Sequence, residues 1–448
     1  MGKPKGGIIM ELMATITKLF NIFGIMGVGG LFTYLCCLLY HNKGTQTIQD
    51  LLRHTYTIGA TGTGKSTKCL NDILKIIDMG YGCLYIDIHG QDSVNLLDYI
   101  PPEHAKRVIY IDPSDLTKPI GLPIFDGIDN HTDAEIAIDN LISLFNVIWP
   151  NFIGPSTEDL LRMASMAVVP NGNATLLEIY LMLVDETYRE TIEIKDSAVR
   201  LFWKETFPEL IKRDKSRLNP PTNKLRKLIM SSICRSVLCQ TNPKFSIKNA
   251  MENNQIVICN FAKGKLGHET ARLLAGIVVC QLQLCTFKRG ANSKPFFIFL
   301  DEFQNYCTES FMEILSESRK YNISLNLYHQ YIAQLPKEIQ AAILNNVGST
   351  YAFRLEGEAG FVAKILGVAE EDIKSLPRFT YYCRKLINGE KEHEAHTEKS
   401  KPLPTEKHNH SRAIISRSRR LYGTDGIKLR NDIENRLQQE YSDIGVIL

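Results

Sequence analysis

Short apolar runs alternate with longer stretches of helical periodicity along most of the chain. Seven of these runs have the length and the β-branched or aromatic content of buried strands. They span residues 55–58, 83–88, 107–111, 255–259, 296–300, 323–329 and 350–354. Helical patterns follow several of them, for example at 67–79 and in a long segment that ends at Phe287. Strands that alternate with helices predict an α/β fold with one doubly wound, mostly parallel sheet and helices on both faces.

The strand pattern disappears between about residues 131 and 250, and helical periodicity replaces it, as in 134–148 and 156–169. We interpret this region as an all-helical domain inserted between strands of the sheet. Its charges are unevenly distributed: residues 131–199 carry eleven acidic and three basic side chains, and 200–250 carry twelve basic and three acidic.

The basic half of this region includes two clusters, at 212–217 and 224–227. Such clusters suit contact with a nucleic-acid phosphate backbone, which is independent of base sequence and sensitive to salt. They equally suit a solvated helix face that pairs with the acidic half or with a neighbouring subunit. Charge alone leaves both interpretations open.

Residues 19–40 contain no charged side chain. As a helix these 22 residues would extend about 33 Å, enough to cross the apolar core of a bilayer. The sequence therefore predicts one N-terminal transmembrane helix, with an apolar helix packed on the protein or on another subunit as the alternative. Lys18 and Lys43 lie on both sides, so the positive-inside rule does not orient the span.

Overall composition is that of a globular protein with two or three domains. The 448 residues are 44% hydrophobic and 23% charged, and the net charge of +3 is too small to indicate a partner. Eleven cysteines are scattered without a Cys-x-x-Cys pair. Several lie in apolar strand or helix patterns, which is typical of reduced, buried thiols rather than a disulfide framework.

A phosphate-binding loop follows the first predicted strand and opens the first long helix. It has the pattern Gly-x4-Gly-Lys-Ser in the strand–loop–helix context that the motif requires. Its glycines let backbone N–H groups approach phosphates, and the helix N-terminus adds a positive dipole. Lys65 would reach the β- and γ-phosphates and the Ser66 hydroxyl would bind Mg²⁺. The predicted nucleotide-binding residues are Gly59, Thr61, Gly62, Thr63, Gly64, Lys65, Ser66 and Thr67.

A second motif ends the apolar strand at 296–300, where Asp301 and Glu302 follow directly. Asp301 would join Ser66 in holding Mg²⁺, and Glu302 would act as the general base that deprotonates the attacking water. A helix-capping Asp is the alternative. Together the two motifs predict ATP hydrolysis with Mg²⁺. Because ATP is cytosolic, they place the chain after the predicted span on the cytoplasmic side of the cell membrane, as a single-pass protein.

Several segments carry a resemblance to known motors. The phosphate loop, residues 301–306, 317–325 and 328–331 look like those of the HerA–FtsK superfamily of RecA-like ATPases. Further segments are most similar to the type IV secretion coupling proteins, the TraG/TraD group. They are 112–115 with 119–121, 154–162, 260–264, 344–347 and 417–423. The resemblance covers about residues 50 to 425.

This resemblance implies a RecA-like ring, expected to be a hexamer, that hydrolyses ATP at subunit interfaces and moves DNA through a central pore. Gln330 resembles the γ-phosphate sensor, and its place at a carboxyl strand end agrees, with helix capping as the alternative. Arg319 resembles an arginine finger offered to a neighbouring subunit. His89 lies in a family turn and has either a site role or a structural one. Residues 262–265 and the helical domain are expected to line the pore, and secretion-channel or DNA-processing proteins are expected partners.

The predicted organisation has five parts: a membrane anchor at 1–43, a nucleotide-binding domain in two parts at 44–130 and 251–390, the inserted all-α domain at 131–250, and a polar loop with a helical tail at 391–448. Within the last part, Glu392, His393 and His396 come one residue short of the His-Glu-x-x-His zinc spacing, and His408 and His410 follow. The polar, proline-bearing composition of 388–410 favours a solvated loop over a metal site.

Three other functions stay open. One is a genome-processing or virus-packaging translocase of the same superfamily, and another is an ATPase that powers protein secretion or pilus assembly. The third is a nucleotide-gated scaffold without steady turnover, against which Glu302 and Gln330 argue. The chain also departs from the family pattern, with one expected span instead of two and an expected end without an acidic C-terminal extension.

Overall fold

The computed structural model describes residues 46–150, 152–172, 174–308 and 310–438. Its described part contains a nine-stranded sheet in the order β11-β8-β7-β1-β6-β5-β2-β4-β3. The strands are β1 (Thr55–Ile58), β2 (Gly82–Asp87), β3 (Val108–Ile111), β4 (Ile256–Asn260), β5 (Phe296–Asp301), β6 (Ile323–His329), β7 (Ser349–Phe353), β8 (Thr380–Arg384) and β11 (His396–Lys399). The seven strands from β7 to β3 are mutually parallel. The mostly parallel α/β sheet predicted from the sequence is confirmed, and the predicted transmembrane helix at 19–40 lies outside the described residues.

Two strands of the nine-stranded sheet, β8 and β11, were not predicted, and β11 corrects the expectation of a solvated loop at 388–410. β8 pairs antiparallel with β7, and β11 pairs antiparallel with β8 at the edge of the sheet. Every second residue of β8 is buried, whereas β11 is largely exposed. An edge strand of this kind needs few apolar residues because one side of it faces solvent, so its sequence resembles a polar loop. A separate hairpin of β9 (Leu386–Ile387) and β10 (Glu390–Lys391) lies between β8 and β11 in the chain.

Side chains of the parallel strands alternate between two apolar layers. In β5, Phe296, Ile298 and Leu300 enter one layer, and Phe297 and Phe299 enter the other. The first layer contains residues of α16 (His268–Phe287), α17 (Ser310–Glu317) and α18 (Lys337–Asn346). The second contains residues of α4 (Lys65–Asp78) and α5 (Gln91–Tyr99). Both faces of the sheet are therefore covered, as its continuous apolar strands require.

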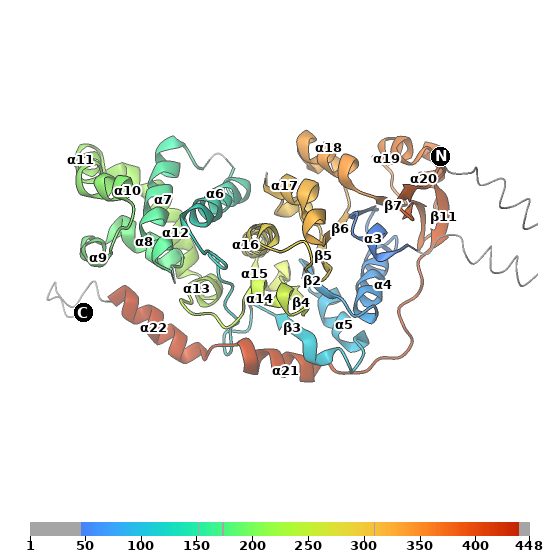
Figure 1. Cartoon of the computed structure of the whole chain (residues 1–448), viewed down its shortest axis with the longest axis horizontal. Coiled ribbons are helices and arrows are strands. Elements are labelled where there is room, and N and C mark those ends of the chain that lie inside the picture. The colour runs from blue at the N-terminus through green and yellow to red at the C-terminus, as the bar shows by residue number, and fades with distance from the viewer. Residues whose placement is uncertain (1–45, 151, 173, 309, 439–448) are drawn as a thin grey trace, which may run out of the picture.

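Helices occupy the chain between β3 and β4, and no strand lies in the described residues of that interval. They are α6 (His131–Ile148), α7 (Pro155–Val168), α8 (Leu176–Val184), α9 (Glu186–Thr191), α10 (Ser197–Leu201), the π-helix η3 (Phe202–Thr206), α11 (Phe207–Arg213), α12 (Asn219–Met230), α13 (Ser232–Leu238) and α14 (Ile247–Glu252). Figure 1 shows most of them gathered beside the sheet, on the left of the view. We call this group the helical lobe; its limits as a domain remain those predicted from the sequence.

The helical lobe and the sheet share one continuous core. Helix α6 packs along α16, and apolar residues of both belong to the layer that covers the sheet. Gly276 on α16 makes the close approach possible, because a Cβ atom there would lie 2.1 Å from Cδ1 of the fully buried Leu144. Among the described helices, α16 is long and apolar enough to cross a membrane. However, 83% of its apolar 18-residue stretch is buried inside the protein, as expected of a core helix.

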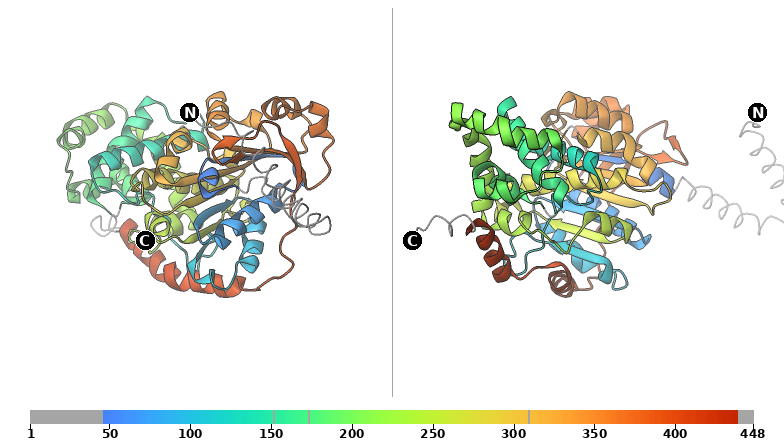
Figure 2. Two further views of the ribbon diagram at one scale, coloured as in Figure 1. Left: turned by 45° about the vertical axis from the view of Figure 1, so that its right-hand side comes forward. Right: turned by 60° about the vertical axis from the view of Figure 1, so that its left-hand side comes forward.

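The C-terminal helices run beneath the sheet and reach the helical lobe. In Figures 1 and 2 the chain leaves β11, passes around the sheet and continues as α21 (Ser411–Tyr422) and α22 (Gly426–Gln438). Ser418 Oγ accepts a hydrogen bond of 3.0 Å from the backbone N–H of Tyr110 in β3. Arg436 on α22 makes an ion pair of 2.6 Å with Glu178 of α8. The tail therefore spans both parts of the molecule.

Short helices α3 (Ile48–Leu51), α15 (Lys263–Leu266), α19 (Ala359–Leu366) and α20 (Glu370–Lys374) complete the fold.

The α6–α16 contact predicts a specific non-additivity. We expect Gly276→Ala to lower the free energy of unfolding by about 1–3 kcal/mol, because Leu144 has no free volume into which to move. In a Leu144→Ala background the same change should be neutral or stabilising by up to about 1 kcal/mol, since alanine favours a helix over glycine. Urea denaturation of the four proteins measures both values. An equal effect of Gly276→Ala in the two backgrounds would contradict the contact.

Candidate functional site

The parallel pairing of three strands creates the candidate site. β6 lies between β1 and β5, with Ile58 opposite His329 and Asp301 opposite Tyr328. The residues that follow these strands therefore emerge side by side at one edge of the sheet. They are the phosphate loop after β1, Glu302 after β5 and Gln330 after β6. Carboxyl strand ends of an open α/β sheet are where ligands bind.

The phosphate loop is held in shape by its own backbone and by its neighbours. Gly62 and Gly64 have φ angles of 77° and 116°, a left-handed conformation that side chains disfavour. A Cβ at Gly64 would also lie 2.7 Å from the ring of Phe379. Thr63 donates its hydroxyl to the Ala60 carbonyl at 2.7 Å and accepts at its own carbonyl from the Phe379 N–H at 2.7 Å. These contacts hold the loop in one defined conformation.

A chain of polar contacts connects the loop to the carboxylate after β5. Lys65 Nζ lies 3.3 Å from Glu302 Oε1, and both side chains are more than nine-tenths buried. Gln330 donates its amide to the same Glu302 oxygen. The Thr61 hydroxyl donates to the side-chain amide oxygen Oε1 of Gln330 at 2.8 Å. The structure thus brings Thr61, Lys65, Glu302 and Gln330 into one hydrogen-bonded group.

The neighbouring carboxyl groups of Asp301 and Glu302 have unequal proton affinities. Burial raises the pKa of Asp301 to about 7, although Lys65 opposes the rise. Burial also acts to raise the pKa of Glu302, but the charge of Lys65 and hydrogen bonds from Gln304 and Gln330 outweigh it and leave that pKa below its ordinary value. Glu302 is therefore the ionised member of the pair at neutral pH, and Asp301 is the one that lacks sufficient positive charge.

The backbone of Glu302 is held in an unfavourable conformation. Its φ and ψ are 51° and 41°, in the left-handed region that costs a residue with a Cβ about 1–2 kcal/mol. Hydrogen bonds fix it there: the Glu302 N–H donates to the Tyr328 carbonyl at 3.0 Å, and the Tyr306 hydroxyl donates to the Asp301 carbonyl at 2.8 Å. Strain of this kind is commonly found where a side chain must be aimed at a ligand.

A cavity of about 350 Å³ opens above the group. Its lining contains the predicted residues Thr61, Gly62, Gly64, Lys65, Ser66, Thr67, Asp301, Glu302 and Gln330. Ser66 and Thr67 belong to the first turn of α4, whose N-terminus points into this region. His89 lines the cavity as well. The turn around His89 is held by Asp87, which accepts from the N–H groups of His89 and Gly90, both at 2.8 Å.

Five residues of the lining were not among the predicted site residues: Ala60, Gln91, Asp92, Arg378 and Phe379. Asp92 is in the first turn of α5, and burial, followed by the charge of Asp87, raises its pKa. The sequence signal that could have indicated Asp92 was a carboxylate at the start of the helix that follows a buried parallel strand. Arg378 lies over the ring of Phe379 at 4.8 Å, and the pair closes one side of the phosphate loop. No local pattern indicated this pair, because its contact with the loop joins residues more than 300 positions apart.

Arg319 lies away from this group. It is in the turn η6 (Ser318–Tyr321) that leads into the amino end of β6, whereas Gln330 follows the carboxyl end. Seven residues of strand separate the two ends by about 20 Å. Its surroundings are basic: burial and the charge of Arg53 lower the pKa of Arg319. Within one chain, Arg319 and the phosphate loop therefore lie at opposite ends of the parallel strands.

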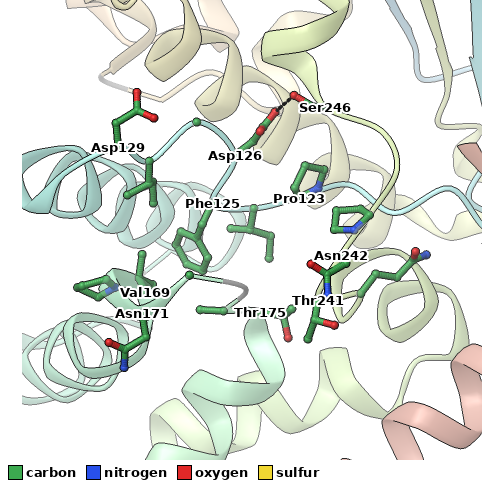
Figure 3. A pocket seen from close by; sticks show the side chains of 18 of the residues that line it. Pro123, Phe125, Asp126, Asp129, Val169, Asn171, Thr175, Thr241, Asn242 and Ser246 are labelled. Carbon is green, nitrogen blue, oxygen red and sulfur yellow. Dashed lines mark hydrogen bonds between the residues drawn. The ribbon is translucent and has the colours of Figure 1, made fainter. Parts of the chain in front are cut away.

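A larger cavity, of about 850 Å³, lies at the border of the helical lobe and contains none of the predicted site residues (Figure 3). Figure 3 shows Pro123, Phe125 and Val169 among its apolar walls. Its carboxylate Asp126 accepts from the Ser246 hydroxyl at 2.8 Å. The cavity offers a mixed lining without the converging charges of the phosphate-loop site, and we assign it no chemistry.

Comparison with known proteins identifies relatives of this arrangement. Residues 295–410 match the family described as "TraM recognition site of TraD and TraG", a segment that contains Asp301, Glu302, Arg319 and Gln330. A search of curated protein sequences finds no match.

Solved structures share the fold at low sequence identity. The plasmid coupling protein TrwB in complex with the GTP analogue GDPNP has 16% identity and a TM-score of 0.59, with 81% of this chain and 90% of that chain covered. TrwB has also been solved with ADP and Mg²⁺, with the same values. VirB4 of Thermoanaerobacter pseudethanolicus has 13% identity and a TM-score of 0.52, with 79% and 90% covered. The predicted resemblance to type IV coupling proteins is thus confirmed for the fold and the matched segment.

Proposed function

We propose that this protein is an ATPase of the type IV coupling-protein kind, which hydrolyses ATP at subunit interfaces of a ring and uses the energy to move DNA. The observation that carries the proposal is the buried contact of Lys65 with Glu302, shared with Gln330, beneath a preformed phosphate loop. A loop alone would bind a nucleotide. A carboxylate aimed into the same cavity and held ionised adds the means to activate water.

The residues present fit ATP and Mg²⁺. The cavity has the size of a small-molecule site and places the loop N–H groups, the N-terminus of α4 and Lys65 around one region, all favourable to phosphates. Asp301, Asp92 and the Ser66 hydroxyl supply the oxygen ligands that Mg²⁺ prefers. Burial raises the pKa of both carboxyls, and a bound cation would favour their ionised forms. When bound, Mg²⁺ would neutralise charge on the β- and γ-phosphates.

The contacts of Glu302 suggest how nucleotide binding would prepare the base. Lys65 holds Glu302 in an ion pair, and Gln330 holds the same carboxylate from the other side. A γ-phosphate would compete for Lys65 and for Gln330, because both are its expected partners. Glu302 would then lose these contacts and become free to accept a proton from water. Gln330 is positioned to report the phosphate, since it connects Glu302 with Thr61 of the loop.

Arg319 is assigned a role between subunits. Its place at the amino edge of the sheet prevents contact with its own phosphate loop. It can serve as an arginine finger only if a neighbouring subunit presents it, and such a finger accelerates phosphoryl transfer by about 10³–10⁵-fold. This requirement supports a closed ring, which we propose to be a hexamer.

DNA is the proposed substrate of the motor. Among the described residues of the helical lobe, no ion pair joins an acidic side chain of 131–199 to a basic side chain of 200–250. In the basic clusters at 212–217 and 224–227, Arg217 pairs with Asp214 and Lys227 pairs with Glu269 of α16. The acidic half does not neutralise the other basic side chains, which favours their use for phosphate contact. Lys263 and Lys265 of α15, beyond the carboxyl end of β4, are the proposed pore residues.

We further propose that residues 19–40 anchor the ring in the cell membrane with the ATPase part on the cytoplasmic side.

A second candidate is an ATPase that powers protein secretion or pilus assembly. The structural likeness to VirB4 favours keeping it, although that likeness extends only to the fold. The two candidates share the hydrolytic site and differ in what stimulates it.

The role of Glu302 predicts a separation of binding from hydrolysis. We expect Glu302→Gln to lower the ATPase rate of the full-length chain by at least about 100-fold, since it removes the general base. ATP affinity should remain, because Lys65 and the loop are intact. Rates and fluorescent-nucleotide binding measure the two properties. Glu317→Gln, on the exposed surface of α17, is the control and should retain activity; substantial turnover by Glu302→Gln would contradict the assignment.

DNA dependence distinguishes the two candidates. The ATPase rate of the full-length chain is measured with single-stranded DNA, double-stranded DNA or neither, at low and high salt. Stimulation that weakens as salt rises supports a DNA motor, because phosphate contacts release counterions. Replacing Lys212, Arg213 and Lys215 with Gln should reduce the stimulation and its salt dependence, and Lys374→Gln on α20 should not. Turnover indifferent to DNA would favour the protein-secretion ATPase.

The position of Arg319 predicts complementation between two inactive variants. Lys65→Ala and Arg319→Ala should each be inactive alone. Co-expressed in equal amounts, they should recover about one quarter of the parent rate, because about one interface in four then combines an intact Lys65 with an intact Arg319. Lys320→Ala, at the adjacent exposed position, should stay active by itself. No recovery in the mixed ring would exclude the role in trans.

A further inference from the structure

Three side chains with different ligand atoms meet on one face of the β8–β11 strand pair. Cys383 and His396 lie directly opposite each other in the antiparallel register, and Glu398 is two residues further along β11, on the same face. The Cys383 Sγ is 3.5 Å from His396 Nε2, which in turn is 3.1 Å from Glu398 Oε1. All three ligand atoms lie within 4.8 Å of one another.

These distances match the edges of a tetrahedral zinc site. Bonds of about 2.3 Å to sulfur and about 2.0 Å to nitrogen or oxygen, at tetrahedral angles, place S and N about 3.5 Å apart and N and O about 3.3 Å apart. The sulfur–nitrogen and nitrogen–oxygen separations observed here are close to both values. A thiol and an imidazole also select against Mg²⁺ and Ca²⁺, which prefer oxygen ligands only.

A second carboxylate is placed to orient the histidine. Glu392 Oε2 lies 3.6 Å from His396 Nδ1, the ring nitrogen on the side away from Cys383. Glu392 is itself held by the backbone N–H of Lys385, which donates to its Oε2 at 2.8 Å. This separation is longer than a hydrogen bond, but a carboxylate beside the second ring nitrogen is the arrangement that orients metal-binding histidines. The cluster therefore has both the ligands and the support of a metal site.

We propose that Cys383, His396 and Glu398 bind one zinc ion, with the fourth position open to solvent. The histidine side chain is 45% exposed, which provides the path of entry, while Cys383 is fully buried. A thiolate and a carboxylate together match the charge of Zn²⁺.

Lys385 is the competitor for this ion. Its ammonium group bonds to Glu398 Oε1, the same oxygen that faces His396, and Tyr381 donates its hydroxyl to Oε2 at 3.2 Å. Lys385 therefore balances the charge of Glu398, and a zinc ion would have to displace it. The affinity of the site reflects this exchange, so removal of the lysine charge should strengthen zinc binding.

The zinc site would brace the segment that closes the phosphate loop. β8 begins directly after Phe379, whose N–H donates to the Thr63 carbonyl. The Phe379 carbonyl accepts from the N–H of Ser400, the residue after β11, at 2.7 Å. A metal bridge between β8 and β11 would hold both sides of this contact together. This role is structural, and it holds whether or not the protein hydrolyses ATP.

The test is zinc binding by the full-length chain after metal removal by chelation. Bound zinc is measured after dialysis against limiting free zinc, and the difference between the parent and Cys383→Ser isolates this site from other thiols and histidines. We expect a difference of one zinc per chain, and an affinity at least about 100-fold lower in Cys383→Ser and in His396→Gln. Glu392→Gln should weaken binding about tenfold. Lys385→Met should tighten it.

Matched controls and a spectroscopic readout make the assignment specific. His393→Gln, between β10 and β11, and His408→Gln, after β11, should bind zinc as the parent does. Co²⁺ substituted for zinc should produce a sulfur-to-cobalt charge-transfer band that is absent in Cys383→Ser and present in His393→Gln. Zinc should also raise the thermal midpoint of the parent but not that of either ligand variant.

Two results would overturn the site. One is equal zinc content in the parent and in folded Cys383→Ser and His396→Gln proteins, as judged by circular dichroism. The other is a cobalt complex whose thiolate band persists in Cys383→Ser, because the metal would then be bound elsewhere. If Lys385→Met binds zinc no more tightly than the parent, the proposed exchange with Glu398 is wrong.

Discussion

Parallel pairing of β6 with both β1 and β5 is the constraint on which the site depends. It places three consecutive strand ends at one edge of the sheet, so that the phosphate loop, Gln330 and Glu302 follow one another across it. Neither the loop nor the carboxylates would form a site without this register, because a shift of one residue would send their side chains to the other face. The ion pair of Lys65 with Glu302 then connects strands that do not touch.

The charges of the side chains in the cavity determine which ligands the site favours. Asp92, Asp301 and Glu302 line one cavity together with Lys65, and burial raises the pKa of the two aspartates. Lys65 and the side-chain amides of Gln304 and Gln330 lower the pKa of Glu302 and keep it ionised. A site with more buried carboxylate than cation favours an incoming divalent ion, and a site with one cation at the loop favours an incoming phosphate. Both preferences exist before any ligand arrives.

The helical lobe is coupled to this sheet through packed side chains rather than through a linker. Helix α6 rests on α16 at Gly276, and α16 belongs to the layer that covers β5. The C-terminal helices add a second connection, from β3 to α8. Close-packed contacts of this kind transmit small displacements, because interiors have little room to absorb them. The carboxyl end of β5 and the helical lobe therefore belong to one packed body.

The sequence by itself determined the elements whose cause is local. Glycine spacing specified the phosphate loop, and continuous apolar runs specified the seven parallel strands and the carboxylates after β5, because neighbouring residues along the chain carry those signals. Only the tertiary structure decided which distant segments meet. Arg378 and Phe379 close the loop from across the sheet, and Arg319 lies at the opposite edge from it. The polar edge strand β11 and its pairing of Cys383 with His396 also depend on partners rather than on pattern, since an exposed edge needs no apolar alternation.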